Sequence, residues 1–223
     1  MKTTYRTLLA VVFLSSMMLA QGPVVPAASK GNRQVPPEQN PASKAFSDKA
    51  VTLRPPKGDK VAIVIFEDLE CPDCANAHPL LMEAKKTYKI PVVVHDFPLP
   101  MHPWAFDGAL YARYFRGVSV KLEAGWREYV YSNQRSITSE SLRQFAETFA
   151  KANKVALPFV IDPQGKLAKE IKADFSLGQR VGVMHTPTIW VVNNNAGKGE
   201  PFVEVVDRSK LYELIDQMKA SAK

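Results

Sequence analysis

Apolar runs alternate along the chain with stretches of helical pattern. Val61–Phe66 contains no polar residue, which is typical of a strand covered on both faces. The helix-compatible stretch Ala75–Tyr88 follows, and then Ile90–Phe97, which reads as a second strand, parallel to the first if the crossover is right-handed. The next strand signals are Ile189–Val192 and Phe202–Val206, which predict a hairpin across a loop rich in Asn and Gly.

Helical pattern fills the long interval between the second and third strands. The expected helices in this interval are Trp104–Phe115, Lys121–Tyr131, Ser139–Ala152 and Gly165–Val181. A closing helix is expected at Ser209–Ala220, and Ala50–Leu53 is a candidate for a short edge strand. The pattern therefore predicts one α/β domain at residues 50–223, with a helical insert at about 104–181.

The beginning of the chain has the pattern of an export signal. Lys2 and Arg6 precede the apolar stretch Leu8–Leu19, which is short for a membrane span, so residues 1–20 are predicted to be a signal peptide. An uncleaved anchor remains an alternative. Residues 21–49 are rich in proline and polar residues and read as a flexible linker. We therefore expect a protein in the periplasm or on the extracytoplasmic face of the membrane.

Charge adds little to this interpretation. The formal net charge of +7 is spread along the 223 residues, without long basic runs or a basic stripe interleaved with aromatic residues. A solvated surface explains this distribution better than a nucleic-acid-binding one, so no nucleic-acid partner is expected. Nothing in the sequence calls for a cofactor.

The candidate chemistry lies in the motif Cys71-Pro72-Asp73-Cys74, which contains the only two cysteines of the chain. It falls where the strand Val61–Phe66 gives way to a helix. Unpaired N–H groups at a helix N-terminus favour a thiolate, so the pKa of Cys71 should lie below the ordinary value of about 8.5. Cys71 is the expected nucleophile and Cys74 the resolving thiol. Pro72 suits the first helical turn, whereas the charge of Asp73 should oppose the thiolate.

Other interpretations of the cysteine pair have less support from the sequence. A zinc site needs two further ligands, for which no spacing is evident, and no metal site is predicted. A disulfide closing a two-residue loop would constrain the unfolded chain very little. Copper binding by Cys71, Cys74 and His185 is the stronger alternative, because thiolates and imidazole are suitable ligands for copper.

A second motif, His185-Thr186-Pro187-Thr188, directly precedes the strand Ile189–Val192. Proline cannot donate a hydrogen bond to a sheet, so it belongs at the first residue of a strand or at a bulge. A plain strand start explains Pro187 from local sequence alone. The order of the two motifs along the chain gives the proline more significance.

Together these motifs resemble the DsbA-like thiol-disulfide oxidoreductase family of the thioredoxin superfamily. Phe66–Cys74 is similar to that family's F-x-D-x-x-C-P-x-C, and Gly182–Thr188 to its G-V-x-x-T-P-T. Asp96–Pro103 resembles the exit from the second core strand, and Pro79 matches the proline of the active-site helix. The resemblance covers about residues 50–220.

This resemblance implies a thioredoxin-like fold with a helical insertion after the second core strand. Cys71 and Cys74 would form the redox pair, Pro187 would be cis, and Thr186 would offer backbone groups to an extended substrate segment. Client proteins with cysteine thiols and a membrane quinone-linked thiol oxidase are the implied partners. His185 and Asp68 are candidate accessory residues beside the pair.

The sequence departs from the family pattern at two places. Asp73 stands where the prototype has histidine, so we expect a weaker oxidant, and an Asp73→His substitution should raise the reduction potential. Relatives often carry a buried acid six residues before the first cysteine, a position that Ile65 occupies here. Glu67, Asp68 or Glu70 could take over its role in proton handling.

The predicted function is an exported thiol-disulfide oxidoreductase, an enzyme that exchanges a disulfide with client thiols, as an oxidase in protein folding. The alternatives are a reductase of the same fold, the copper-binding chaperone described above, and a peptide-binding chaperone with a dispensable disulfide. An isomerase is less favoured, because residues 21–45 do not resemble a dimerisation domain.

Overall fold

The computed structural model describes residues 53–194 and 201–222, all within a unit that spans Gln39–Lys223. The predicted signal peptide and linker lie outside these residues, as does the candidate edge strand except for Leu53, which is not part of a strand. The elements in chain order are β1 (Val61–Glu67), α2 (Pro72–Tyr88), β2 (Val92–Asp96), α3 (Ala105–Val118), α4 (Val120–Asn133), η2 (Gln134–Ser136), α5 (Leu142–Ala152), α6 (Lys166–Arg180), β3 (Thr188–Asn193), β4 (Phe202–Glu204), η3 (Arg208–Lys210) and α7 (Leu211–Ser221).

Four strands form one sheet in the order β2-β1-β3-β4. β1 runs parallel to β2 and antiparallel to β3, and β3 and β4 form the predicted hairpin. Val64, in the middle of β1, pairs with Val93 on one side and with Trp190 on the other. All seven residues of β1 are buried, as its unbroken apolar sequence predicted.

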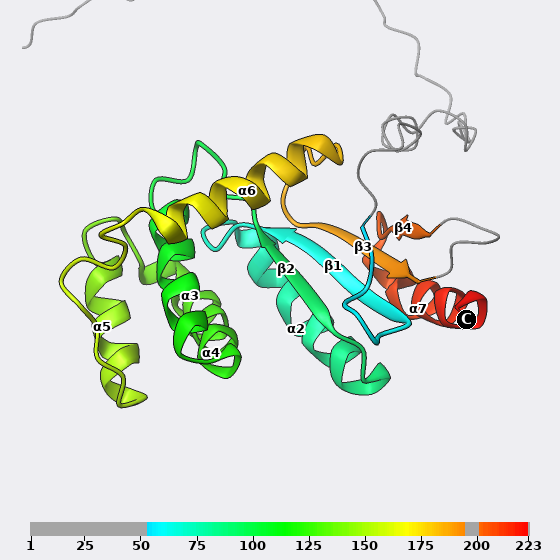
Figure 1. The fold of residues 1–223 in the computed structure, drawn as a ribbon, viewed down its shortest axis with the longest axis horizontal. Coiled ribbons are helices and arrows are strands. Elements are labelled where there is room, and N and C mark those ends of the chain that lie inside the picture. The colour runs from blue at the N-terminus through cyan, green and yellow to red at the C-terminus, as the bar shows by residue number, and fades with distance from the viewer. Residues whose placement is uncertain (1–52, 195–200, 223) are drawn as a thin grey trace, which may run out of the picture. The chain divides into compact units, whose positions relative to one another are not determined.

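Both faces of the sheet are covered, because successive side chains of a strand point to opposite faces. Ile63 and Ile65 pack with residues of α2 and α7 on one face. Val64 and Phe66 pack on the other face in a cluster that includes Val181, just after α6, with residues of α6 around it. Figure 1 shows α6 crossing the sheet on the side opposite α2. This three-layer arrangement places the end of β1 and the start of α2 at one edge of the core.

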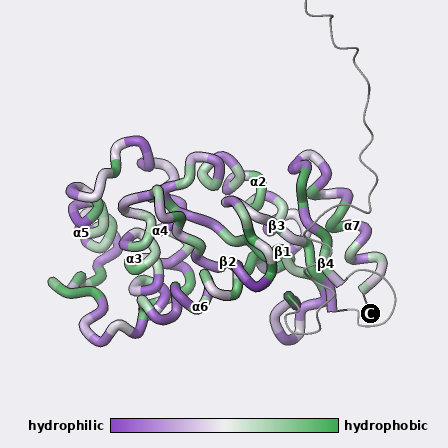
Figure 2. The backbone as a smooth tube through the Cα atoms, turned by 90° about the horizontal axis from the view of Figure 1, so that it is seen from above, coloured by the Kyte–Doolittle hydropathy of each residue, from purple (hydrophilic) through white to green (hydrophobic). Residues whose placement is uncertain are grey.

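The helical insert has a core of its own. Helices α3, α4 and α5 pack around Trp126, which is fully buried and whose indole nitrogen donates to the Gly108 carbonyl over 3.1 Å. Seen from above, these helices gather at one end of the domain, with β4 and α7 at the other (Figure 2). Because α3 to α6 lie between β2 and β3, the predicted thioredoxin-like fold with a helical insertion is confirmed.

Most element boundaries differ from the sequence-based expectation by one to three residues, and two of these differences have a clear physical cause. β2 begins at Val92 rather than Ile90, since Pro91 has no N–H to donate and contributes only its carbonyl, which accepts from Ile63 N over 3.0 Å. α5 begins at Leu142 rather than Ser139. Thr138 and Ser141 hydrogen-bond each other and close a turn before that helix starts. Within the described ranges, no helix has the length and apolar character needed to cross a membrane.

Candidate active site

The first cysteine of the motif lies at the N-cap of α2. Cys71 has an extended backbone (φ −73°, ψ 119°), and its carbonyl accepts from the N–H groups of Cys74 (3.1 Å) and Ala75 (3.2 Å). Pro72 occupies the first helical position, where its missing N–H costs no hydrogen bond, and it is exposed. The Cys71 side chain thus stands at the positive end of a 17-residue helix.

The second motif reaches Cys71 through the sheet. β3 runs antiparallel to β1, so the start of β3 lies beside the end of β1, with Thr188 paired to Phe66. The loop before β3 therefore meets the loop after β1. The Cys71 Sγ lies 3.3 Å from the Thr186 carbonyl oxygen, and the Thr186–Pro187 peptide bond is cis, as the resemblance implied.

Cys71 has the character of a nucleophilic thiol. Only 7% of its surface is exposed, and its pKa is lowered to about 5. The largest cause is a hydrogen bond from the Cys74 thiol, followed by the Thr186 side chain and the first N–H groups of the helix, and these outweigh the opposing effect of burial. At neutral pH the Cys71 sulfur is therefore a thiolate.

Cys74 has the opposite character. It is 1% exposed, and the backbone N–H of Asp68 donates to its sulfur over 3.4 Å. Burial raises its pKa well above the ordinary range, and the hydrogen bond to Cys71 and the charge of Glu67 raise it further. One thiol of the pair is ionised and lies against the Thr186 loop, while the other is protonated and almost fully buried. The two cysteines are free thiols in this structure.

Asp68 contacts Cys74 through its backbone, and its side chain has other partners. Its carboxylate accepts from the N–H groups of Glu70 and Leu99, each over 2.7 Å, and lies 2.7 Å from His102 Nδ1. This carboxylate fastens the loop after β1 to the loop after β2. The structure therefore places the Asp68 side chain in loop–loop contacts.

Glu67 is the acid whose charge reaches Cys74. Its carboxylate is 3.0 Å from Nη1 of Arg127, whose Nη2 lies 2.9 Å from Asp96 and 3.1 Å from Glu123. Burial raises the pKa of Glu67, and the Arg127 charge opposes that rise. A buried carboxyl group next to the resolving thiol is suited to exchanging a proton with it. Of the three acids considered from the sequence, Glu67 has this position.

Asp73 points away from the core and forms an ion pair with Arg208, at the start of η3. The two side chains are 55% and 35% exposed. The sequence predicted that the Asp73 charge opposes the Cys71 thiolate. In the structure, Arg208 lies beside that carboxylate. This pairing offsets part of the unfavourable charge.

His185 is exposed on the loop that carries Thr186, and its carbonyl accepts from the Thr188 hydroxyl over 2.6 Å. Within residues 53–194 and 201–222, no group of three or more His, Cys, Asp or Glu side chains is arranged to hold a metal ion. Cys71, Cys74 and His185, the residues named for the copper alternative, thus do not form such a group among the described residues.

Three residues near the motif were not anticipated from the sequence. Gln134, in η2, donates from Nε2 to the carbonyls of Leu69 (2.8 Å) and Cys71 (3.1 Å) and so ties the insert to the active-site loop. Arg127 and Arg208 are the other two. Each lies far along the chain from its partner, and no local spacing signals the contact.

Comparison with known proteins agrees with this geometry. The sequence model of the family described as Thioredoxin matches residues 58–215. A double-substitution variant of Wolbachia pipientis alpha-DsbA1 is 15% identical with a TM-score of 0.62, covering 75% of this chain and 94% of that one. A periplasmic thioredoxin-like protein from Salmonella enterica serovar Typhimurium is 21% identical (TM-score 0.59; 74% and 87% covered). The thiol-disulfide exchange protein alpha-DsbA2 from Wolbachia pipientis is 16% identical (TM-score 0.57; 79% and 91% covered). A search of curated proteins found no match.

The chain belongs to the thioredoxin family, since that family's model spans most of its length. The solved structures share its fold, and the predicted DsbA-like architecture is confirmed. An ionised thiol over a protonated one, beside a cis proline, is an arrangement that can perform thiol–disulfide exchange.

Proposed function

We propose that the protein is an exported oxidoreductase that transfers the disulfide between Cys71 and Cys74 to the thiols of client proteins. The observation that carries this proposal is the asymmetry of the pair: Cys71 has a pKa of about 5, whereas that of Cys74 is raised far above the ordinary range. A stabilised thiolate favours the reduced form of the protein and therefore makes its disulfide a stronger oxidant.

The exchange proceeds in two displacements. A client thiolate attacks Cys71 Sγ, the client–Cys71 bond forms, the Cys71–Cys74 bond breaks, and Cys74 leaves as a thiolate that takes up a proton. A second client thiolate then attacks the client sulfur of the mixed disulfide, and Cys71 leaves as a thiolate. The client loses two electrons and the protein gains them. The low pKa of Cys71 speeds the second step, since it makes Cys71 a good leaving group.

Export and reoxidation complete the proposal. The apolar stretch Leu8–Leu19, which follows Lys2 and Arg6, supports export of the protein to an oxidising compartment, where disulfides persist. A membrane quinone-linked thiol oxidase is the proposed acceptor of the two electrons, as the family resemblance implies. Thr186 and Pro187 are proposed to bind an extended client segment beside Cys71.

A Cys74→Ala variant tests the proposal. It lacks the thiol that can displace a client from Cys71, so mixed disulfides that the Cys71 thiolate forms with client disulfides should accumulate and be identified by mass spectrometry after non-reducing electrophoresis. A Cys71→Ala variant is the matched control and should trap none. If the two variants trap the same low amount, or if wild-type protein fails to oxidise a reduced client, disulfide donation is wrong.

A reductase is the second candidate, because the DsbA prototype has a histidine where Asp73 stands and a carboxylate gives the thiolate less support. The measured reduction potential separates the two. A value near about −270 mV indicates reduction of clients, and one near about −120 mV indicates their oxidation. For the copper alternative, stoichiometric Cu(I) that is lost in His185→Ala is the distinguishing result.

A further inference from the structure

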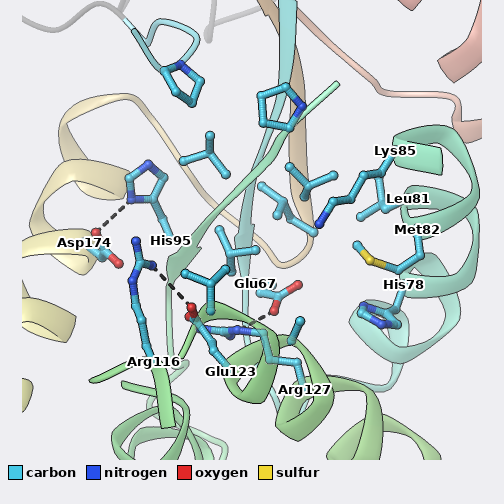
Figure 3. A pocket seen from close by; sticks show the side chains of 18 of the residues that line it. Glu67, His78, Leu81, Met82, Lys85, His95, Arg116, Glu123, Arg127 and Asp174 are labelled. Carbon is cyan, nitrogen blue, oxygen red and sulfur yellow. Dashed lines mark hydrogen bonds and ion pairs between the residues drawn. The ribbon is translucent and has the colours of Figure 1, made fainter. Parts of the chain in front are cut away.

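β2 lies at the outer edge of the described sheet. It pairs with β1 alone, and no other described strand lies beside it. A cavity of about 480 Å³ runs along this edge, and the strand lines it with Val92, Val93, Val94 and His95 (Figure 3). At the C-terminal end of β2, Asp174 Oδ2 accepts from the backbone N–H of Asp96 over 3.1 Å, so this N–H is already hydrogen-bonded.

Part of the wall of this cavity is apolar. α2 contributes Leu81 and the half-buried Met82, and α4 contributes Val120 and Ala124. Val120 is 70% exposed, so the wall continues out to the surface. These surfaces suit the apolar side chains of an extended chain, which point to one face at every second residue.

The lining of the cavity carries more cations than carboxylates: Lys85, Arg113, Arg116 and Arg127 against Glu67, Glu123 and Asp174. Lys85 reaches from α2 toward the strand in Figure 3, and it makes no ion pair with any described residue. The Arg116 side chain is 50% exposed and lies 3.5 Å from Glu123. Deeper in the cavity, the buried Arg127 Nε has no hydrogen-bond partner among the described groups. Acidic groups in a ligand would therefore find unused donors here.

The backbone edge of β2 favours a peptide over a purely apolar ligand. A purely apolar ligand lying over it would cover peptide N–H and C=O groups without bonding them, which is unfavourable. An extended peptide pairs with those groups while its side chains enter the cavity. We propose that the β2 edge binds an extended segment of a partner protein with alternating apolar and acidic residues, which adds a strand to the sheet.

This docking site does not include the exchanging residues. Cys71, Cys74, Thr186 and Pro187 do not line the cavity, whereas Glu67 and Arg127 from the surroundings of Cys74 do. A client held at the β2 edge would keep its cysteines at high local concentration near the redox pair, provided that its chain spans the distance between the two sites. The inference goes beyond the proposed function, since binding at this edge requires no disulfide chemistry.

The test is a titration of the isotopically labelled protein with the peptide acetyl-Glu-Val-Glu-Val-Glu-Ser-amide, followed by amide NMR shifts. The expected result is saturable shifts centred on Val92–His95. Lys85→Glu should weaken binding by about tenfold or more, because it places like charges together. Lys86→Glu is the matched control: it changes a neighbouring exposed lysine on the same helix that does not line the cavity, and it should change affinity by less than about twofold.

Two further peptides sharpen the outcome. A version with lysine in place of every glutamate should not bind. One with proline in place of the second valine should bind much more weakly, since proline has no N–H to donate to the edge strand. Shifts centred on Cys71 and Thr186 instead of β2, equal losses in the two lysine variants, or undiminished binding of the proline peptide would each overturn the proposal. None of these outcomes depends on whether the protein oxidises clients.

Discussion

Replacing Cys71 by serine should change the pH dependence of stability of the reduced protein by a predictable amount. The pKa of Cys71 is about 5 in the folded protein, against an ordinary value of about 8.5 in the unfolded chain. A group whose pKa is lowered by folding stabilises the folded state above its unfolded pKa. That contribution declines as the pH falls and is gone below the folded pKa.

The magnitude follows from the size of the pH window. Between about pH 4 and about pH 7, nearly two pH units lie above the folded pKa, at about 1.4 kcal/mol per unit. The reduced wild type should therefore gain about 2.7 kcal/mol over Cys71→Ser across this range. Cys74 adds nothing here, since its pKa is raised and it stays protonated in both states over this range.

Urea unfolding of the two proteins at both pH values, in a phosphine reductant, measures this difference. All other titrating groups are common to both chains and cancel. Thiolate ultraviolet absorbance should independently titrate near pH 5, and should move to higher pH in Cys74→Ala, which lacks the thiol that lowers the pKa most. A stability difference that is the same at both pH values, with absorbance rising only above about pH 8, would refute the reasoning.

Three further predictions concern the surroundings of the pair. Arg208→Ala leaves Asp73 without its cation and should lower the reduction potential by up to about 30 mV, equivalent to about 1.4 kcal/mol. Adding Asp73→Asn should restore the potential, and a redox titration that shows no restoration would exclude the ion pair as the cause. Arg127→Leu removes the shared cation of three buried carboxylates and should lower the free energy of unfolding in urea by about 3–5 kcal/mol. A change near zero would contradict the buried network. Gly178→Ala places a Cβ 2.6 Å from the Phe97 ring and should destabilise the folded protein by about 1–3 kcal/mol. Gly117→Ala, whose Cβ would have nothing within 4 Å, should be neutral or stabilise it by up to about 1 kcal/mol. Equal shifts of the melting temperature in the two variants would argue against tight packing at Gly178.

The parts of the fold that could be predicted are those encoded locally. The unbroken apolar run of β1 specifies a strand buried on both faces, and a cysteine pair just after it specifies where the helix begins. Pro187 at a strand start gave the second motif, and its place in the order of elements linked the two. These signals needed only a few adjacent residues each.

The electrostatic surroundings could not be predicted in the same way. Glu67 and Arg127 are 60 residues apart, and Asp73 and Arg208 are 135 apart. Their pairing depends on how α4 packs against the end of β1 and how η3 approaches α2, and neither is visible in spacing. The sequence could nominate Glu67, Asp68 and Glu70 as acids near the thiols. Only the structure separates Glu67, whose charge raises the pKa of Cys74, from the acids whose carboxylates fasten loops.

The contact between Cys71 and Thr186 joins residues 115 apart, with the whole helical insert between them. During synthesis, the cysteines therefore emerge long before the strand that completes their surroundings. Until β3 takes its place between β1 and β4, the pair lacks its partner loop. The contact between Cys71 and the Thr186 carbonyl therefore forms only after the insert and β3 have been made.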